Sequence, residues 1–272
     1  MNDRVTVTLE GGVADVRLTR PDKMNALDNA MFESLVAAGE RLMGDKAVRA
    51  VVLSGEGRAF CAGLDMGNFG RMAEGGGAPA AARSDEGLGA RTHGPANRAQ
   101  YACWVWRELP VPVIAAVHGV AFGGGFQVAL GADIRYVAPD TRLSVMEIKW
   151  GLVPDMAGTQ LMRHLAREDI VRELTYTGRI FSGEEAFQYG FATRLSADPR
   201  AEALATAREI AGKSPDAIRA AKRILNDAVL VDPKTGLTQE SVEQGRLIGS
   251  PNQVEAVKAN LEKRTPAFAY PG

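Results

Sequence analysis

Cysteine and histidine are scarce in this sequence of 272 residues, and their scarcity excludes two kinds of stabilising site. The two cysteines, Cys61 and Cys103, are too few to build a disulfide framework in a chain of this length. The three histidines, His93, His118 and His164, are too scattered to match the spacing of zinc ligands. We therefore expect no metal site, cysteines that are buried small hydrophobic residues rather than nucleophiles, and a reducing cytoplasm as the location.

Long apolar runs and an excess of one charge are also missing. The N-terminal segment MNDRVTVTLEGG shows strand-like alternation instead of the apolar core of a signal peptide, and no apolar run is long enough to span a bilayer. Lys and Arg number 32 and Asp and Glu 33, so the formal net charge is −1 and there is no basic field for nucleic acid. We expect a protein that binds neither nucleic acid nor a membrane.

The sequence does contain the alternation of strand and helix patterns that builds an α/β fold. Apolar residues alternate on both sides of the glycine pair at 11–12, which predicts a β-hairpin. Two fully apolar runs, 50–55 and 113–117, are typical of buried strands, and a further strand is predicted at 133–138. Helical spacing follows Asp28, whose side chain can cap a helix. Strands that alternate with helices predict a largely parallel sheet.

Two regions depart from this alternation. Residues 69–100 are rich in Gly, Ala and Arg and have weak periodicity, so we expect a partly mobile loop over a site. After Asp198-Pro199 only helical patterns remain. The chain is therefore predicted to have a core at 1–198 that carries the site and a C-terminal helical region at 199–272. Helices of that region are expected at 200–212, 216–229, 236–249 and 252–264, packed on the core, on a neighbouring subunit or on both.

Two glycine-containing turns follow two of the predicted buried strands. GRAFCAGLDM (57–66) follows the strand at 50–55, and HGVAFGGGFQVAL (118–130) follows the strand at 113–117. The second turn opens a helix, whose N-terminus concentrates free N–H groups and positive potential. Turns at the ends of adjacent parallel strands can each direct one N–H at a single oxygen, which is an oxyanion hole. The alternative is that each is a tight turn without a ligand.

A third stretch, MEIKWGLVPDMAGTQ, places Glu147 and Asp155 among apolar residues. A carboxylate held against apolar side chains has a raised pKa and can act as an acid or base near neutral pH. The alternatives are a surface carboxylate and a helix cap. Trp104 and Trp106 are expected to fill the core or a pocket wall, and His118 to pack in a turn. The motifs of dinucleotide, P-loop, nucleophile-elbow and HExxH enzymes are absent.

Together these stretches resemble the crotonase superfamily, which contains the enoyl-CoA hydratases and isomerases. The resemblance implies an α/β fold in which ββα units form a spiral core, followed by a C-terminal helical trimerisation region. It also implies a homotrimer or a hexamer of paired trimers. The segments that carry the likeness, in the same order as in the family, are PDKMNALD (21–28), AFCAGLDM (59–66), VHGVAFGGGFQVALGADIRYVA (117–138), EIKWGLVPDMAGTQLM (147–162) and LEKRTPAF (261–268).

The same resemblance implies the substrate and much of the site. The substrate would be an acyl-coenzyme A thioester, with no cofactor other than the CoA that it carries. The N–H groups of Leu64 and Gly124 would form the oxyanion hole. CoA would lie against two segments of this chain and against the C-terminal tail of a neighbouring subunit. The expected contacts are Lys23, Ala26, Ala62, Leu64, Asp65 and Met66, with Lys263 and Phe268 from the tail.

Departures from the family pattern bear on the reaction. Hydratases of the family hold a water between two glutamates, and one of these falls at Gln127, an amide that cannot accept a proton. Glu147 keeps the other glutamate, as in enoyl-CoA isomerases. Asp155 lies eight residues later, a spacing similar to that of dienoyl-CoA isomerases, which have a further aspartate at the position of Gln127. Asn260 replaces an aromatic residue in the tail.

The sequence thus favours an enzyme of the enoyl-CoA hydratase/isomerase type that stabilises an enolate. The favoured reaction is isomerisation of an enoyl-CoA or dienoyl-CoA double bond, with Glu147 and Asp155 as acid and base. One alternative is hydration of a trans-2-enoyl-CoA with a water oriented by Gln127. The other is an acyl-CoA binding protein with little turnover.

Overall fold

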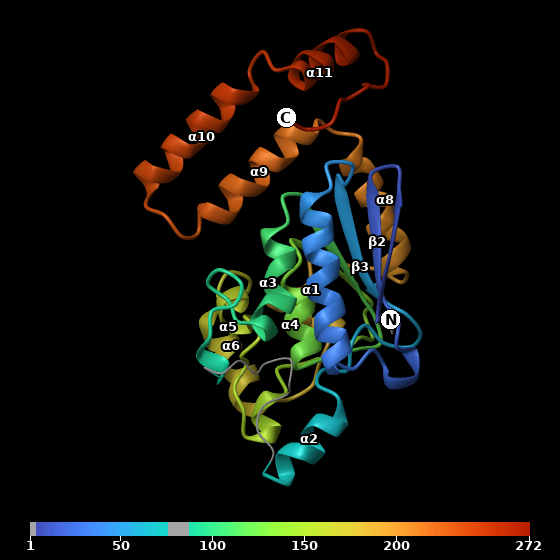
Figure 1. Cartoon of the computed structure of the whole chain (residues 1–272), viewed down its shortest axis with the longest axis vertical. Helices are drawn as coiled ribbons and strands as arrows, with labels where there is room; N and C mark the ends of the chain where they lie inside the picture. The colour runs from blue at the N-terminus through green and yellow to red at the C-terminus, as the bar shows by residue number, and fades with distance from the viewer. Residues whose placement is uncertain (1–3, 76–86) are drawn as a thin grey trace.

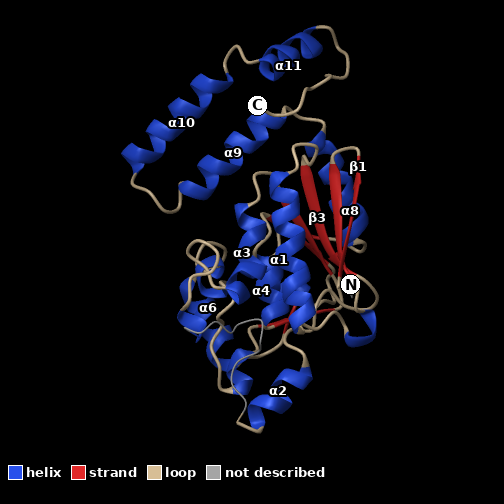
Figure 2. Ribbon diagram, in the orientation of Figure 1, coloured by secondary structure: helices blue, strands red, loops and turns tan. Residues whose placement is uncertain are grey.

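The computed structural model describes residues 4–75 and 87–272 and shows an α/β fold built around a six-stranded sheet (Figures 1 and 2). The hairpin predicted at the N-terminus is present, with the glycine pair at 11–12 in the left-handed region that its tight turn requires. In this sheet the neighbouring strands after the hairpin run parallel, in agreement with the largely parallel sheet predicted. In spatial order the strands are β1 (Val5–Glu10), β2 (Val13–Leu18), β3 (Ala50–Gly55), β4 (Val113–Val117), β6 (Ile134–Val137) and β9 (Arg194–Leu195).

Helices cover both faces of this sheet, which is why its central strands read as continuous apolar runs. In β3, Val51 and Leu53 point into the larger apolar core, whereas Ala50 and Val52 point to the opposite face. That opposite face packs against a helix rich in alanine, which allows close approach to the sheet. The covering helices are α1 (Asn29–Gly44), α3 (Arg98–Glu108) and α4 (Gly124–Leu130) on one face and α8 (Pro199–Ala211) on the other.

A second sheet has three strands, β5, β7 and β8, of which β5 follows β4 in the chain and β7 follows β6. Its strands β5 and β7 are parallel, and β7 and β8 are antiparallel. Three edge-to-face or tilted contacts among Phe126, Phe181 and Phe191 fill the space between this sheet and α4. The elements of this part are β5 (Val120–Phe122), β7 (Arg142–Ser144), η4 (Glu147–Trp150), α5 (Gly158–Met162), α6 (Glu168–Thr177), β8 (Phe181–Ser182) and α7 (Gly183–Tyr189).

The prediction of a loop over 69–100 is wrong at both ends. Helix α2 spans Met66–Ala73, because the Asp65 side chain accepts a hydrogen bond from the N–H of Gly67 and caps it. A reciprocal capping box of Asn97 and Gln100 starts α3 at Arg98. Between them lie the short helix η3 at 87–89 and the segment 76–86, which is outside the described residues. The mobility predicted for this region therefore stays a prediction.

The predicted C-terminal helices are all present, and the first of them, α8, belongs to the core. The other three form a C-terminal arm, defined here as α9–α11, that extends from one end of the core (Figure 1). The arm is anchored by Lys222, whose buried ammonium group donates to the carbonyls of Trp106 and Val111 and pairs with Asp133 at 2.8 Å. No described helix is apolar and long enough to cross a bilayer. The arm helices are α9 (Pro215–Asp227), α10 (Pro233–Leu247) and α11 (Pro251–Leu261).

Several single residues lie where the sequence predicted. Cys61 and Cys103 are buried free thiols, and burial raises the pKa of Cys61 to about 12. Trp106 is fully buried in the core, and Trp104 is half-buried against it. The Nε2 atom of His118 lies 2.9 Å from the backbone carbonyl oxygen of Gly57, in the turn that follows β3. Burial raises the pKa of both thiols, which are therefore protonated at neutral pH.

The turns after β3 and β4 contact each other through their backbones. The N–H of Cys61 donates to the carbonyl of Val120 at 3.0 Å, and the carbonyl of Cys61 accepts from Phe122 at 3.1 Å. A Cβ atom on Gly125 would lie only 2.2 Å from the Cys61 carbonyl oxygen. Glycine at 125 therefore permits the close approach that holds the two turns together.

We expect Gly125→Ala to lower the free energy of unfolding by about 1–3 kcal/mol, because the added methyl group would push two hydrogen-bonded turns apart. Chemical denaturation measures this change. Gly245→Ala is the matched control, since Gly245 lies in α10 with nothing within 4 Å of the added carbon. That control should be neutral or stabilising by up to ~1 kcal/mol. Equal stability of the Gly125→Ala variant would contradict the close packing.

Candidate active site

The two predicted oxyanion N–H groups lie on the turns that contact each other. The N–H of Leu27 donates to Gly63 at 2.8 Å and that of Asp65 donates to Leu27 at 3.1 Å, which leaves the N–H of Leu64 between two paired groups. Gly124 is the first residue of α4, where an N–H has no partner inside the helix. Within residues 4–75 and 87–272, neither N–H donates a hydrogen bond to another protein atom. Both are therefore available to an acceptor from outside.

At each of the three consecutive glycines at 123–125, a neighbouring group lies too close to leave room for a side chain. A Cβ on Gly123 would lie 3.2 Å from a carboxylate oxygen of Glu147, and Gly123 has a φ of 49°. A Cβ on Gly124 would lie 2.7 Å from Leu27 and 2.8 Å from Met156. The glycines thus allow a carboxylate and two apolar side chains to approach the start of α4.

Glu147 brings a buried, half-partnered carboxylate to this position. It is the first residue of η4, and its Oε1 accepts a hydrogen bond from the amide Nε2 of Gln127 at 2.6 Å. Its Oε2 is buried and has no hydrogen-bond partner among the described residues. Burial raises the pKa of Glu147, hydrogen bonds to it lower the pKa in part, and the charge of Asp155 raises it further. A carboxylate with one free buried oxygen and a raised pKa is suited to accept and return a proton.

Gln127 is a buried amide whose oxygen is fully used. Its Oε1 accepts from the N–H groups of Met156 and Gly158 at 2.9 and 2.8 Å. These two bonds fix the orientation of the amide and direct its nitrogen at Glu147. The structure therefore shows Gln127 positioning the glutamate, whereas sequence reasoning considered it mainly as a residue that could hold a water.

Asp155 is the second predicted acid or base, and it lies close enough to Glu147 for its negative charge to raise the pKa of Glu147. Its side chain reaches the surface, yet the protein atoms around it disfavour the charged form, so burial raises its pKa. The structure thus brings both predicted carboxylates to one place.

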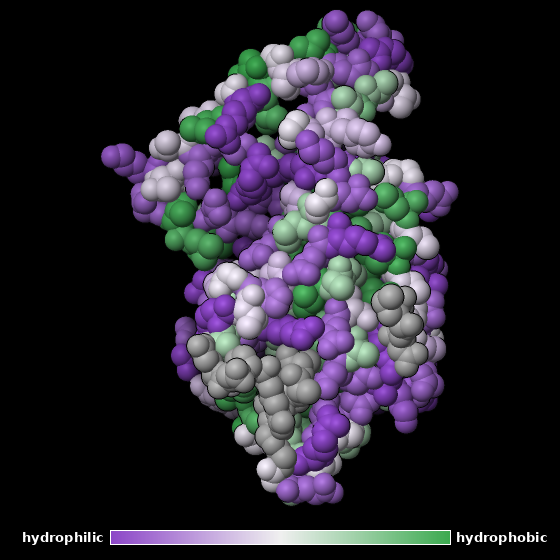
Figure 3. Space-filling view, in the orientation of Figure 1, coloured by the Kyte–Doolittle hydropathy of each residue, from purple (hydrophilic) through white to green (hydrophobic). Residues whose placement is uncertain are grey.

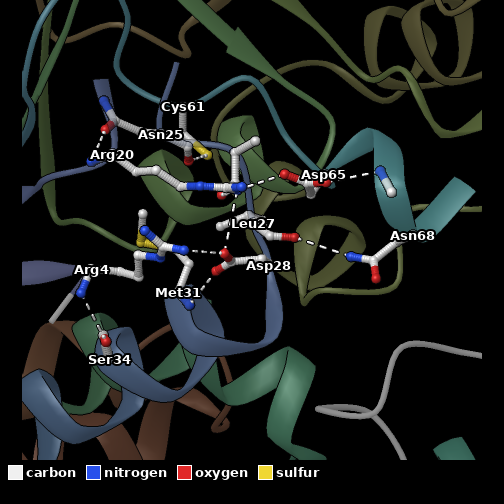
Figure 4. Close-up of polar contacts among 12 residues, drawn as sticks. Arg4, Arg20, Asn25, Leu27, Asp28, Met31, Ser34, Cys61, Asp65 and Asn68 are labelled. Atoms are coloured by element: carbon white, nitrogen blue, oxygen red, sulfur yellow. Dashed lines mark hydrogen bonds and ion pairs between the residues drawn. The ribbon is translucent and has the colours of Figure 1, made fainter. Parts of the chain in front are cut away.

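Asp65, which we expected to contact CoA, is held by the protein itself (Figure 4). One of its oxygens accepts from Gly67 and the other pairs with Arg20 at 2.6 Å. Burial raises the pKa of Asp65, but these two partners lower it more, so the net pKa is below the usual value. Arg20 also reaches Asp28, which pairs with Arg4 at 2.8 Å. The network ties the turn that carries Leu64 to the starts of α1 and β1.

The remaining predicted contacts with CoA fall into two groups. Lys23, Ala26, Ala62 and Met66 come from adjacent segments, joined by a bond from the N–H of Ala62 to the Met24 carbonyl. Lys23 and Met66 are exposed, Ala62 is half-buried, and Ala26 is buried.

The tail residues Lys263 and Phe268 lie elsewhere in the same chain. The carbonyl of Phe268 accepts from Arg49, next to the start of β3, whereas Leu64 follows the end of that strand. Six residues of strand separate the two places by about 20 Å. The predicted contact of this tail with CoA therefore needs a neighbouring subunit and stays a prediction.

Sequence reasoning missed three residues that the fold brings to this site. Arg20 binds Asp65, and the Nδ2 of Asn68 donates to the Leu27 carbonyl at 3.3 Å. Trp150, three residues after Glu147, stacks on an aromatic ring of α2. Only its place in the EIKW stretch could have drawn attention to it. Among the residues that the structure describes, no group of three or more His, Cys, Asp or Glu side chains could hold a metal ion.

The architecture is that of the crotonase fold. An enoyl-CoA hydratase structure from Bacillus anthracis superposes with a TM-score of 0.84 at 29% identity and covers 97% of this chain and 98% of that one. The structure of DspI from Pseudomonas aeruginosa gives the same TM-score at 28% identity, with 98% and 97% covered. The fold therefore places the chain in the crotonase class of proteins.

Comparison of sequences assigns the family. The model of the enoyl-CoA hydratase/isomerase family matches residues 8–271. A protein of Mycobacterium tuberculosis named "Probable enoyl-CoA hydratase" is 33% identical over 264 residues, 97% of this chain and 98% of that protein. The mitochondrial methylglutaconyl-CoA hydratase of Mus musculus is 29% identical, with 94% and 79% covered. The chain belongs to the enoyl-CoA hydratase/isomerase family and is an enzyme of that family.

The raised pKa of Glu147 predicts a pH-dependent effect of Glu147→Gln on stability. Below the pKa of the glutamate in the unfolded chain, the folded and unfolded states both carry the neutral acid, which resembles glutamine, so both proteins should unfold at similar temperatures. As pH rises from there through the raised folded-state pKa, the unfolded chain ionises more readily than the folded protein and the unaltered protein loses stability, whereas the variant does not. The difference in Tm, variant minus unaltered, should therefore grow from pH 4 to pH 8 in thermal unfolding.

The exposed Glu240 of α10 provides the matched control for this series. Glu240→Gln should show no such growth with pH. A constant Tm difference for Glu147→Gln would mean that the carboxyl is solvated in solution.

Proposed function

We propose that this enzyme moves a carbon–carbon double bond of an enoyl-CoA thioester, with Glu147 carrying the proton. The observation that supports this most is the 2.6 Å hydrogen bond from Gln127 to Glu147, together with the two backbone N–H groups that occupy the Gln127 oxygen. A single buried carboxylate, held by an amide at one oxygen and free at the other, suits transfer of one proton. Hydration by the two-glutamate route needs a second carboxylate at 127.

The proposed steps follow from the positions of these groups. The thioester oxygen of a 3-enoyl-CoA accepts hydrogen bonds from the N–H groups of Leu64 and Gly124. Oε2 of Glu147 takes the proton from C2, and the electron pair of that C–H bond forms a dienolate whose negative charge rests on the thioester oxygen. The same carboxyl then returns the proton to C4, which gives the 2-enoyl thioester. No atom is gained or lost.

Asp155 extends this proposal to dienoyl thioesters. Its raised pKa and its influence on Glu147 support a shared role, in which one carboxyl removes a proton and the other supplies one at a more distant carbon. Gln127 stands where dienoyl-CoA isomerases have an aspartate, so the pair of carboxyls here would be Asp155 and Glu147.

Hydration of a trans-2-enoyl-CoA is the second candidate. The names of the relatives support it, because the proteins of Mycobacterium tuberculosis and Bacillus subtilis both carry the name "Probable enoyl-CoA hydratase". In this reaction Glu147 would act with a water, and the remaining N–H of the Gln127 amide would orient it. Loss of one of two acid–base groups costs roughly 10²–10⁴-fold, so a slow hydratase is expected in that case.

A substrate panel of 2-enoyl, 3-enoyl and 3,5-dienoyl thioesters tests the proposal. Purified enzyme should convert 3-enoyl or dienoyl thioesters to products of unchanged mass, measured by chromatography and mass spectrometry. Glu147→Gln should lower kcat by roughly 10²–10⁴-fold, because the proton carrier is lost, and should leave the affinity for a saturated acyl-CoA nearly unchanged. Asp155→Asn should reduce conversion of the dienoyl thioester most.

Rapid formation of 3-hydroxyacyl-CoA, one water heavier than its substrate, would overturn the isomerase proposal in favour of hydration. Tight acyl-CoA binding without turnover of any thioester would point to a binding protein. Glu240→Gln should leave all rates unchanged and serves as the control variant.

We further propose that the protein assembles as a homotrimer, or as a hexamer of paired trimers, through its C-terminal arm. Hydrophobic side chains are exposed to solvent along this arm (Figure 3). Exposed apolar surface of this kind is typical of a protein–protein interface. The side chains concerned are Leu225, Leu230, Leu237, Ile248 and Leu261.

Sedimentation should give three or six times the chain mass, and a monomer would contradict the assembly. If the tail of one subunit reaches the CoA of another, Lys263→Ala should weaken acyl-CoA binding about three- to fivefold at low salt, as expected for one exposed charge, with unchanged mass. Lys234→Ala, also on the arm, is the matched control and should bind acyl-CoA normally.

A further inference from the structure

Two aromatic rings join the element that follows the oxyanion turn to the element that carries Glu147. Phe69 of α2 and Trp150 of η4 stack with ring centroids 3.9 Å apart and planes inclined by 19°. Phe69 lies five residues after Leu64, and Trp150 lies three residues after Glu147. The stack leaves 38% of Trp150 exposed.

Both rings stand on anchored elements. Helix α2 is fixed at its start by the Asp65 cap and by the bond from Asn68 to the Leu27 carbonyl. Helix η4 is fixed by the hydrogen bond to Glu147 and ends at Gly151, which has a φ of 69°. The stack therefore joins two rigid supports, and a 3.9 Å separation leaves no room for a chain between the rings.

Several large side chains close to the two rings in sequence are apolar and exposed, while the ammonium group of Lys149 lies 5.6 Å from the centre of the Trp150 ring. Three apolar side chains that follow Glu147 along the chain are exposed, and so is one at the start of α2. Exposed apolar side chains that lie close together are typical of a binding site. Such side chains beside a thioester site suit the apolar part of an acyl group. They are Met66, Ile148, Leu152 and Val153.

The direction of the acyl chain follows from the proposed chemistry. With the thioester oxygen at Leu64 and Gly124 and the reacting carbons at Glu147, later carbons of the chain would run past Glu147 toward Trp150, which lies three residues further along the 3-10 helix η4 and therefore on the same side of it. Figure 1 shows α2, which carries Phe69, at the end of the molecule opposite the C-terminal arm, so the stack is distant from the arm of the same chain. The stack joins α2 to η4.

We propose that the Phe69–Trp150 stack closes the distal end of the acyl site and restricts the enzyme to short apolar acyl groups. This inference rests on the proposed function only in taking an acyl-CoA as the ligand, whichever reaction follows. A methylene buried on binding is worth about fourfold in affinity, so affinity should rise with chain length until the chain meets the rings and then stop rising.

Calorimetric binding of saturated butyryl-, hexanoyl-, octanoyl- and decanoyl-CoA tests this limit without any turnover. In the unaltered protein the ratio of decanoyl to butyryl affinity should be low. Trp150→Ala and Phe69→Ala should each raise this ratio at least about tenfold, because either substitution opens the end of the site. Trp150→Phe, which retains a ring for the stack, should keep the original ratio.

Phe187→Ala removes an exposed aromatic ring from α7 and is the matched control, with an unchanged ratio expected. An unchanged or lower ratio in both alanine variants, with butyryl-CoA still bound, would overturn the inference and leave the proposed function intact. Failure of every acyl-CoA to bind the unaltered, folded protein would instead overturn the proposed function.

Discussion

Contact between the backbones of two strand-end turns is the constraint on which the rest of this structure depends. The Cys61 N–H donates to the Val120 carbonyl and the Cys61 carbonyl accepts from Phe122. Leu64 and Gly124 therefore lie on neighbouring turns, and neither N–H donates to another protein atom among the described residues. A Cβ at Gly63 would lie only 2.5 Å from the Phe122 carbonyl oxygen on the other turn. Parallel strands β3 and β4 bring the turns to one edge of the sheet, and the glycines let them touch. A methyl group at this contact would separate the two donors.

The second organising feature is a single carboxylate that is buried beside this contact. Glu147 loses solvation there, and the Gln127 amide compensates part of that loss through one short hydrogen bond. The amide can do so because its oxygen is held by Met156 and Gly158, so its orientation does not change with the charge of the glutamate. A carboxylate at 127 would repel Glu147 and the amide does not. The amide therefore holds Glu147 at one oxygen, while the other oxygen is buried without a partner among the described residues.

Much of the fold and part of the site were open to prediction because they depend on local patterns. Apolar runs marked β3 and β4, the glycine pair at 11–12 marked the hairpin, and helical patterns after Asp198-Pro199 marked the C-terminal helices. The order of the motifs was enough to identify the family. Prediction failed over 69–100, where short capping signals at Asp65 and Asn97 define helix ends that weak periodicity does not reveal.

The sequence by itself determined the fold class, the family and the presence of one glutamate where hydratases of the family have two. Only the tertiary structure decided three pairs: Gln127 donates a hydrogen bond to Glu147, Arg20 forms an ion pair with Asp65, and Phe69 stacks on Trp150. These pairs are separated by 20 to 81 residues, so no periodicity or spacing links their members. Their partners were fixed by how the strands and helices pack, since a hydrogen bond or a ring stack forms only between groups that the fold brings within a few ångströms.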